Sequence, residues 1–585
     1  MEFLKVLMNK IVPHQAHRID NGRTPTEVHR PYKRTHIPVN MSATGQEASS
    51  SPTETSEMDL EEYPPGFPSE SSSGMAGSAK RGDEEDMDIT RANSLNPDQN
   101  FLEKMEKSAS QSNEGKNPEF EVFFEEGSMD PENIAMHISW PRKYYVSTLV
   151  TLISGIITMI SSCWSLVAEN VMSHFHISRE VGVLGISLYI FGLGCGPLLL
   201  SPISELYGRR ITFIFSLSFS VAWQCLVIWS PTIEGVFFGR FLSGFFGSSF
   251  LSVASGTISD IFTKDQIGIP MTFYALAPFA GPSLGPVLSG AFNKDSYRWP
   301  FIVMMIVSSV LLGLVTFTVP ESYKPVLLIR KARRLRKETG DDRYYAPLEV
   351  LRGDANILQL IFLSVKRPIA LLLRDYMIGV LSFYTGLVLA IIYLYFEVFP
   401  YIYPKLWNFT VMETGLAYLG LLIGMIIVCP SCLIFQKNYA RRVERNGGKS
   451  TPEMRFEALF YGAFCTPTGL VIFAWTCYSH VHWVGSLIGS AVFGAGVFFV
   501  FVGVFAYTVD AYRRFAASAM ACNTFTRCIM AGVFPLFGRQ MYEGMGINWA
   551  GFLLAMVAVG MIPVPFLFTK YGPVLRGKSP YAWDD

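Results

Sequence analysis

Windows of about 20 apolar residues recur through most of this chain, and each is long enough for a helix to cross the hydrocarbon core of a bilayer. Inside a bilayer every backbone N–H and C=O group needs a partner within the protein, so continuous apolar windows of this length fold as helices. Half of the 585 residues are hydrophobic, which agrees with a membrane class. The windows lie near residues 146–168, 181–203, 211–230, 236–259, 267–292, 300–319, 370–399, 413–436, 457–478, 482–508, 515–540 and 547–570. We therefore predict an all-α integral membrane protein with twelve transmembrane helices.

The intervals between the windows predict the domain organisation. Residues 1–140 are polar, with Ser-rich and acidic runs, and we expect a disordered cytoplasmic tail because such a segment buries too little apolar surface to fold. The longest later interval divides the windows six and six. We expect an N-terminal bundle at 141–320, a cytoplasmic central loop at 321–369, a C-terminal bundle at 370–570 and a cytoplasmic tail at 571–585.

Lysine and arginine are distributed unevenly between alternate loops. With the N-terminus in the cytoplasm, the inner segments carry most of them, including the basic run 330–337 in the central loop. The outer loops then hold Arg179, Lys294, Arg298, Lys405 and Arg539. Because cytoplasmic loops carry the excess of positive charge, this bias predicts that both termini are cytoplasmic. We interpret the basic run as a topology signal that contacts lipid headgroups, with a specific partner site as the alternative.

The residues do not support an ATP-driven or catalytic function. Gly448-Lys449-Ser450 ends like a phosphate-binding loop, but Val443 stands where the first glycine of that loop is required. We predict neither a His-Glu-x-x-His metal site nor a Gly-x-Ser-x-Gly nucleophile elbow. We expect no enzyme activity, no cofactor, no metal site and no nucleic-acid partner. Of the ways to drive uphill transport, these residues leave an ion gradient as the energy source.

The loop between the second and third windows is the strongest single indication of function. It contains Glu205, Gly208, Arg209 and Arg210, which cannot lie in hydrocarbon and so mark a membrane face between two hairpinned helices. This loop resembles motif A of the major facilitator superfamily. The resemblance implies two six-helix bundles and an inner gate in which these four residues act with Asp260.

Charged residues inside the windows are candidates for proton coupling, because an unpaired ion at bilayer depth costs several kcal/mol and is kept for a partner or a task. Arg240 begins a stretch, 240–247, that resembles motif B, the proton-linked arginine of the superfamily. Its structural alternative is a snorkelling arginine, since it lies near the start of its window. Glu397 is our candidate proton carrier, with a position at the outer rim as the alternative.

The fifth window contains Gly268, Gly281, Pro282 and Gly285. Prolines remove backbone hydrogen bonds and glycines allow close helix contact, so without further context this segment predicts only a bent, tightly packed helix. The four residues also resemble motif C, the antiporter signature of superfamily drug exporters. Together with the other two motifs, this resemblance favours antiport over uptake.

Several stretches narrow the resemblance to fungal twelve-span drug:proton antiporters, including polyamine exporters and azole-resistance pumps. They are residues 320–323, 333–340, 396–400, 523–538, 544–551, 561–565 and 578–582. The resemblance implies a proton-coupled exporter of hydrophobic or cationic drugs and toxic metabolites in the plasma membrane. A polyamine or pathway-specific toxin exporter is the alternative, and a uniporter or nutrient sensor of the same fold is a third possibility.

A pocket for diverse hydrophobic molecules is expected to be aromatic and sparsely charged. Ordinary helix packing or lipid contact is the alternative for each candidate. Polyamines would require buried carboxylates, of which Glu169, Glu397 and Asp510 are available. We expect a monomer whose partners are small molecules, protons and the bilayer, with Asn408 as a glycosylation acceptor. The candidate pocket residues are Trp164, Tyr189, Tyr274, Tyr384, Tyr393, Phe396 and Asn523.

Overall fold

The computed structural model describes residues 120–124, 138–262, 266–293, 296–354, 357–512, 515–579 and 581–582. All of them belong to one compact unit, Lys80–Asp585. Most of the predicted N-terminal tail, 1–140, lies outside the described residues.

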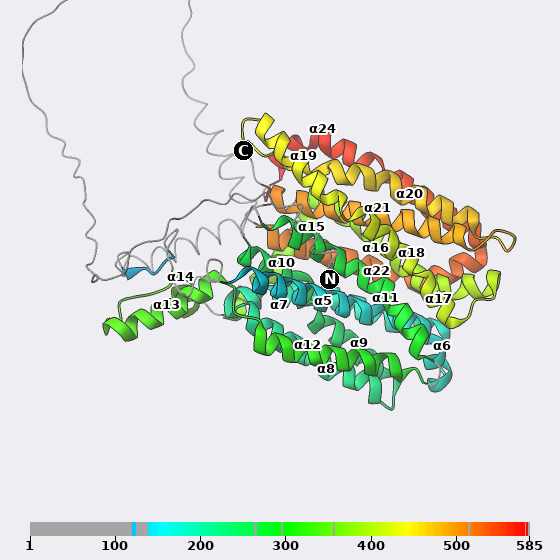
Figure 1. Ribbon diagram of the computed structural model, residues 1–585, viewed down its shortest axis with the longest axis horizontal. Coiled ribbons are helices and arrows are strands. Elements are labelled where there is room, and N and C mark those ends of the chain that lie inside the picture. Colours follow the sequence, from blue (N-terminus) through cyan, green and yellow to red (C-terminus); the bar gives the residue numbers. More distant parts are fainter. Residues whose placement is uncertain are drawn as a thin grey trace, which may run out of the picture. The chain divides into compact units, whose positions relative to one another are not determined.

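The described chain is helical and contains no strand beyond one isolated bridge between Glu121 and Tyr345 (Figure 1). The first half consists of α5 (Trp140–Ser162), α6 (Trp164–Phe175), α7 (Arg179–Tyr207), α8 (Arg209–Trp229), α9 (Ile233–Gly247), α10 (Ser249–Ile261), α11 (Gly268–Phe292) and α12 (Arg298–Thr318). The connecting region contains α13 (Lys324–Thr339), α14 (Pro347–Asp354) and α15 (Ile357–Arg374). The second half consists of α16 (Tyr376–Trp407), α17 (Val411–Ala417), α18 (Leu419–Val428), α19 (Ser431–Arg445), η2 (Pro452–Phe456), α20 (Glu457–Thr476), α21 (Val484–Ala511), α22 (Ala516–Met545), α23 (Ile547–Gly560) and α24 (Pro563–Lys578).

Eleven helical segments in the described residues are long and apolar enough to cross a membrane. The twelfth predicted span is α11, whose 25 residues include no charged side chain but contain four prolines and several glycines and serines. These residues lower its hydropathy without shortening it. Six spans therefore precede the central region and six follow it, and the predicted all-α membrane fold is confirmed.

The ends of the second half differ from the intervals expected above. The seventh span begins at Tyr376 rather than near residue 370, because Asp375 caps α16 by accepting a hydrogen bond from the backbone N–H of Met377 at 2.9 Å. The preceding helix α15 is separate. At the other end, α24 continues to Lys578, so helix occupies the first residues of the interval expected to be a tail.

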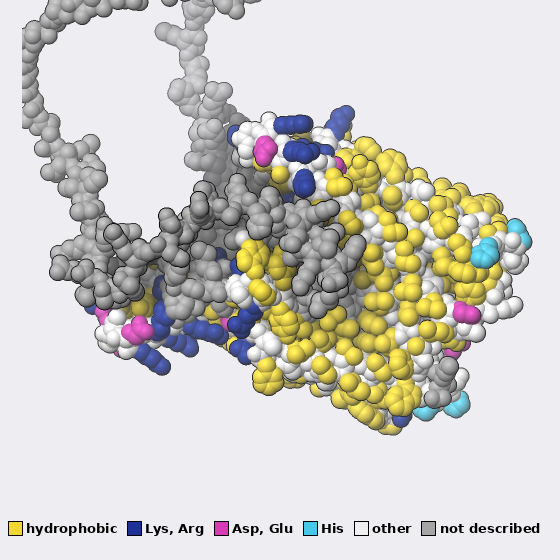
Figure 2. Space-filling view, in the orientation of Figure 1, with side chains coloured by type: hydrophobic (Ala, Val, Ile, Leu, Met, Phe, Trp, Pro, Cys, Tyr) yellow, Lys and Arg dark blue, Asp and Glu magenta, His cyan; other side chains and the backbone are white. Residues whose placement is uncertain are grey.

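Figure 2 shows hydrophobic side chains over most of the helical body, with lysine and arginine gathered at the end that contains α13 and α19. Histidine side chains lie at the opposite end. Large apolar side chains are exposed on the body, among them Phe317, Leu373 and Ile427. An apolar surface of this extent, bounded by charge, is suited to contact with lipid.

Helices α5 and α11 pack closely because two glycines of α11 face the backbone of α5. A Cβ atom at Gly281 would lie 2.2 Å from the carbonyl oxygen of Gly155, and one at Gly285 would lie 2.5 Å from that of Met159. Both distances are shorter than a van der Waals contact, so any side chain at these positions would separate the helices. The Gly/Pro pattern of the fifth window thus has a direct packing role.

We predict that Gly281→Leu lowers the thermal unfolding midpoint of the solubilised full-length protein, because overpacking a close contact costs about 1–3 kcal/mol or more. Gly313→Leu is the matched control, since a Cβ atom there meets nothing within 4 Å. Equal midpoints for the two variants would contradict the packing role of Gly281.

Candidate functional site

The turn between α7 and α8 is built around Gly208 and the carboxylate of Glu321. Gly208 has φ of +104°, and a Cβ atom there would lie 2.4 Å from Oε2 of Glu321. The backbone N–H groups of Arg209 and Arg210 donate to this carboxylate at 2.8 and 3.1 Å. Glu321 is 1% exposed and therefore places a buried negative charge at the N-terminus of α8, where the helix dipole favours it.

The side chains of the two arginines extend this arrangement. Arg209 Nε donates to Oδ2 of Asp260 at 3.3 Å, and Arg209 Nη1 donates to Oγ of Ser204 at 2.8 Å. Arg210 Nη2 donates to the carbonyl oxygen of Thr316 at 2.7 Å. We call Arg209, Arg210, Asp260 and Glu321 the inner charge cluster. The expected pairing of Arg209 with Asp260 is present and joins α8 to α10, and the bonds to Ser204 and Thr316 add α7 and the end of α12.

Tyr323 covers one face of the inner charge cluster. The guanidinium carbon of Arg209 lies 4.6 Å from the centre of its ring. Burial, and secondarily the charge of Glu205, raises the pKa of the Tyr323 hydroxyl to about 12. The ring is therefore neutral at physiological pH, and its face remains available for the cation.

Glu205 lies close to Arg209 and Tyr323 but is not part of the inner charge cluster. Its side chain is exposed, and no ion pair joins it to Arg209. It instead lines a cavity between α7, α15 and α22 together with Arg367 and Ser518. The structure thus brings together four of the five residues expected at the inner gate and places Glu205 beside the second half of the protein.

Arg240 is fully buried in the first half, with 1% of its surface exposed, so the snorkelling alternative does not apply. Its three nitrogen positions donate to three backbone carbonyls at 2.9 to 3.0 Å, those of Gly185, Ile160 and Ser161. The guanidinium also lies over three rings, those of Trp164, Tyr189 and Phe301. No described carboxylate pairs with Arg240. It binds α5, α7 and α9 together by backbone oxygens and ring faces.

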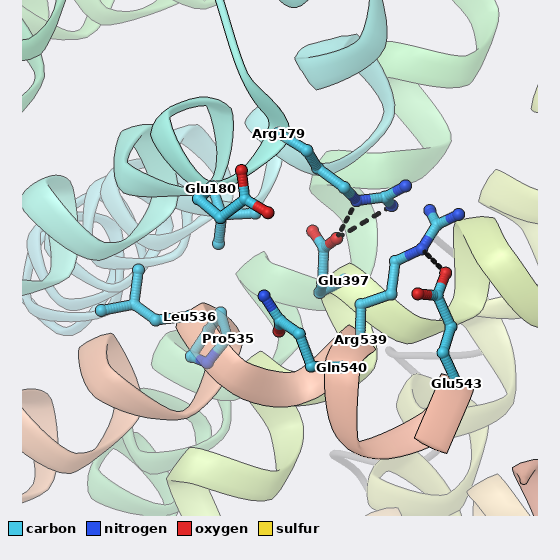
Figure 3. Close-up of a pocket in the computed structure, with 9 residues that line it drawn as sticks. Arg179, Glu180, Glu397, Pro535, Leu536, Arg539, Gln540 and Glu543 are labelled. Atoms are coloured by element: carbon cyan, nitrogen blue, oxygen red, sulfur yellow. Dashed lines mark hydrogen bonds and ion pairs between the residues drawn. The ribbon is translucent and has the colours of Figure 1, made fainter.

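Glu397 is 7% exposed and forms an ion pair with Arg179, whose Nη2 lies 3.0 Å from Oε1 (Figure 3). Arg179 begins α7 in the first half and Glu397 lies in α16 of the second, so the pair joins the two halves. Arg539 and Glu543 of α22 form a second pair beside it. Both pairs line a cavity with Gln540. The two residues expected to couple protons, Arg240 and Glu397, do not contact each other.

The candidate pocket residues are all buried, and none of them lines either of the two cavities described above. Trp164 and Tyr189 pack against Arg240, while Tyr274 donates to the carbonyl oxygen of Leu251 at 2.8 Å. Asn523 donates to Oγ1 of Thr385 at 2.9 Å within the second half. The remaining candidates, Tyr384, Tyr393 and Phe396, lie on α16.

Tyr393 and Phe396 lie where the two halves meet. The hydroxyls of Ser161 and Tyr393 are 2.9 Å apart, and Oγ of Ser165 donates to the carbonyl oxygen of Phe396. At another point of the junction, the ring centres of Phe279 and Phe501 are 4.2 Å apart. Aromatic and hydroxyl groups thus form the contact between α5, α11, α16 and α21.

The carboxylates considered for polyamine recognition are poorly placed for it. Glu397 is paired with Arg179, and Oδ2 of Asp510 lies 2.7 Å from Nε of Arg455. Glu169 is exposed. Within the described residues no group of three or more His, Cys, Asp or Glu side chains is arranged to hold a metal ion.

The structure explains one motif in α11 and two further residues by their place in the helices. The segment from Gly281 to Gly285 has the letters of a nucleophile elbow, but Ser283 lies inside α11 and donates to the carbonyl oxygen of Phe279, so it is not exposed at a turn. Gly268 and Asn408 are the remaining site residues predicted from the sequence. A Cβ atom at Gly268 would meet Gln436 of the second half, and Asn408 caps the C-terminal end of α16 in a left-handed conformation and is exposed.

Three residues of this architecture were not singled out from sequence, namely Arg179, Glu321 and Arg527. Arg527 lies within the eleventh window, so an ionisable residue at bilayer depth was a signal available in the sequence. Glu321 stands in a stretch that carried the family resemblance. For Arg179 the sequence offers only a loop charge, because its partner is 218 residues away.

The twelve spans form two sets of six, each half contains a buried arginine, and an ion pair joins the halves. These features define a two-bundle secondary transporter. A family model described as Major Facilitator Superfamily matches residues 146–535, and the chain belongs to that superfamily.

Proteins named as antiporters, efflux pumps or multidrug transporters are similar to this chain over most of its length. It is 64% identical over 492 residues to the "Probable drug/proton antiporter YHK8" of Saccharomyces cerevisiae, covering 84% of this chain and 96% of that protein. It is 41% identical over 397 residues to "Efflux pump atB" of Aspergillus terreus, covering 67% and 83%. It is 32% identical over 463 residues to the "Major facilitator superfamily multidrug transporter FLU1" of Candida albicans, covering 78% and 75%. A solved structure, that of the human organic anion transporter MFSD10, matches with a TM-score of 0.50 and 13% identity over 73% of this chain and 99% of that one, which shows the fold alone.

We predict that Glu321→Gln destabilises the solubilised full-length protein more than Glu338→Gln does. Hydrogen bonds to a charged acceptor contribute about 1.5–3 kcal/mol, and the Glu321 carboxylate accepts several backbone N–H groups. Glu338 is largely exposed, which makes it the control. Thermal unfolding midpoints measure both, and a shift no larger for Glu321→Gln would contradict its structural role.

Proposed function

We propose that this protein exports hydrophobic drugs and toxic metabolites across the fungal plasma membrane in exchange for protons. Its similarity to a drug/proton antiporter over 96% of that relative is the observation that carries the proposal. The efflux pump and multidrug transporter among the other relatives support the same class of activity. The inter-half contacts described above supply what an exchanger needs, namely reversible closure at two ends.

Closure at the outer end involves the Arg179–Glu397 pair, and closure at the inner end involves Gln436, whose Nε2 donates to the carbonyl oxygen of Gly268 at 3.3 Å. Each contact joins one half to the other. In alternating access only one end opens at a time, so these two sets of contacts would break in turn.

The Arg179–Glu397 pair suggests how a proton is exchanged. When the outer end opens, Glu397 would separate from Arg179 and become accessible to protons from outside. A proton would then be taken up from outside while the outer end is open and lost when it closes, which is the direction that drug export requires. Arg240 would act as a fixed support for α5, α7 and α9 near this path.

Polyamine export is less well supported than export of hydrophobic molecules, because the carboxylates that would hold several ammonium groups are paired or exposed. The aromatic junction around Tyr393 and Phe396 instead offers ring faces and hydroxyls. We further propose a monomer with both termini in the cytoplasm, the basic central region at the inner face and Asn408 as the glycosylation acceptor.

We predict that Arg240→Ala abolishes pH-driven uptake of hydrophobic dyes into inverted membrane vesicles, because it removes the donor that three backbone carbonyls of α5 and α7 share. Arg240→Lys should restore only part of the activity, since one ammonium cannot reach three separated carbonyls as a guanidinium does. Arg298→Ala, at the outer end of α12, is the matched control. Uptake by Arg240→Ala that a protonophore still abolishes would contradict the need for this support in transport.

The topology is tested by single cysteines at Ser296 and Glu338, after replacement of any native cysteine that reacts. In intact cells an impermeant thiol reagent should label Ser296→Cys and not Glu338→Cys, because the charge bias places the first outside and the second inside. Labelling with the opposite pattern would invert the protein and with it the direction of the proposed exchange.

A further inference from the structure

Arg527 lies on α22 in the second half and is 6% exposed. Its Nε and Nη1 atoms are buried and have no hydrogen-bond partner. The guanidinium carbon lies 5.6 Å from the ring centre of Phe501 and 5.1 Å from that of Phe505, both on α21. Ring faces attract a cation but do not replace the acceptors that its N–H groups lose on burial. Arg527 is therefore a buried cation with unused donors.

No described carboxylate compensates this charge. The acids in the spans of the second half have partners elsewhere, since Asp375 accepts from Tyr512, while Glu397 and Asp510 pair with arginines. A buried charge without a counter-ion is unfavourable by several kcal/mol. Arg240 shows the contrast, because all of its nitrogen positions reach backbone oxygens.

The surroundings of Arg527 place it at the junction of the two halves. Phe501, which lies against its guanidinium, also packs on Phe279 of α11. A Cβ atom at Gly194 of α7 would lie 2.7 Å from Cβ of Cys528, the next residue of α22. Substrate sites of two-bundle transporters lie between their halves, so the unused donors are in the region that a substrate would enter.

Asn523, one turn earlier on the same face of α22, adds a second unsatisfied atom. Its Nδ2 is used by Thr385, but its Oδ1 is buried without a partner. Unsatisfied donors and an unsatisfied acceptor on one helix face, with phenyl rings beside them, describe a site prepared for an amphipathic ligand.

We propose that Arg527 binds an acidic group of the exported molecule, so that the preferred substrates are hydrophobic organic acids in their anionic form. This inference rests on the proposed export function and specifies its substrate class. The carboxylate would accept a charge-assisted hydrogen bond from Nε or Nη1, which lie on different edges of the guanidinium, and the apolar body of the ligand would lie against Phe501 and Phe505. Binding would neutralise the charge of Arg527 and supply an acceptor to donors that have none in the described structure.

The test uses three naphthalene probes of nearly equal shape and different charge, 1-naphthoate, 1-naphthamide and 1-naphthylmethylammonium. Their dissociation constants for the full-length protein in lipid nanodiscs are measured by calorimetry at pH 7. Wild type should bind 1-naphthoate at least about tenfold more tightly than either other probe, a ratio equivalent to about 1.4 kcal/mol. Arg527→Gln should remove this preference while leaving 1-naphthamide binding within about twofold, because it deletes only the charge-assisted contact.

Arg527→Lys should keep part of the preference, and Arg298→Gln should keep all of it. No binding of 1-naphthoate to wild type, equal affinity for the three probes, or a preference that survives in Arg527→Gln would each overturn the proposal and indicate a guanidinium satisfied by water. The measurement needs no pH gradient. A failure of pH-driven efflux with the preference intact would therefore contradict antiport alone, and normal dye efflux without the preference would contradict the acid site alone.

Discussion

The structure depends on the requirement that every charge and backbone polar group within the bilayer find a partner inside the protein. This requirement explains why the chain forms helices and why most of its charges lie at the ends of the spans. It also makes the exceptions informative. Arg240 satisfies it with three backbone carbonyls and three rings, and so stabilises the first half. Arg527 leaves Nε and Nη1 without a hydrogen-bond partner, and this difference separates a structural cation from a binding one.

The contacts within a half differ in kind from those between halves. Within the first half, Gly281 and Gly285 bring α11 against the backbone of α5, and such a contact changes little without separating the helices. Between the halves, several contacts are single polar pairs such as Arg179–Glu397 and Ser161–Tyr393. A neutral hydrogen bond contributes about 0.5–1.5 kcal/mol net and one to a charged group about 1.5–3 kcal/mol, so each such pair can be exchanged at modest cost. Rigid halves with exchangeable junctions are what a rocking motion requires.

How much of the structure can be predicted from the sequence depends on how far apart in the chain the interacting residues lie. The spans depend on local composition, so their number and approximate positions were predicted, and even α11 was found because its length compensates for its prolines. The Arg209–Asp260 pair was expected from the resemblance to motif A. Pairs such as Arg179–Glu397, 218 residues apart, depend on how one bundle packs on the other, and no local pattern specifies them.

Arg240 and Arg527 show why residue type and depth are insufficient to assign a role. Each is an arginine inside an apolar window, and the sequence gives both the same physical reason for attention. Their roles differ because the carbonyls of α5 and α7 are near Arg240, whereas phenyl rings of α21 are near Arg527. Carbonyl oxygens use up a guanidinium's donors and rings leave them free. The capacity to bind an acid therefore arises from what the neighbouring helices lack, which only their packing reveals.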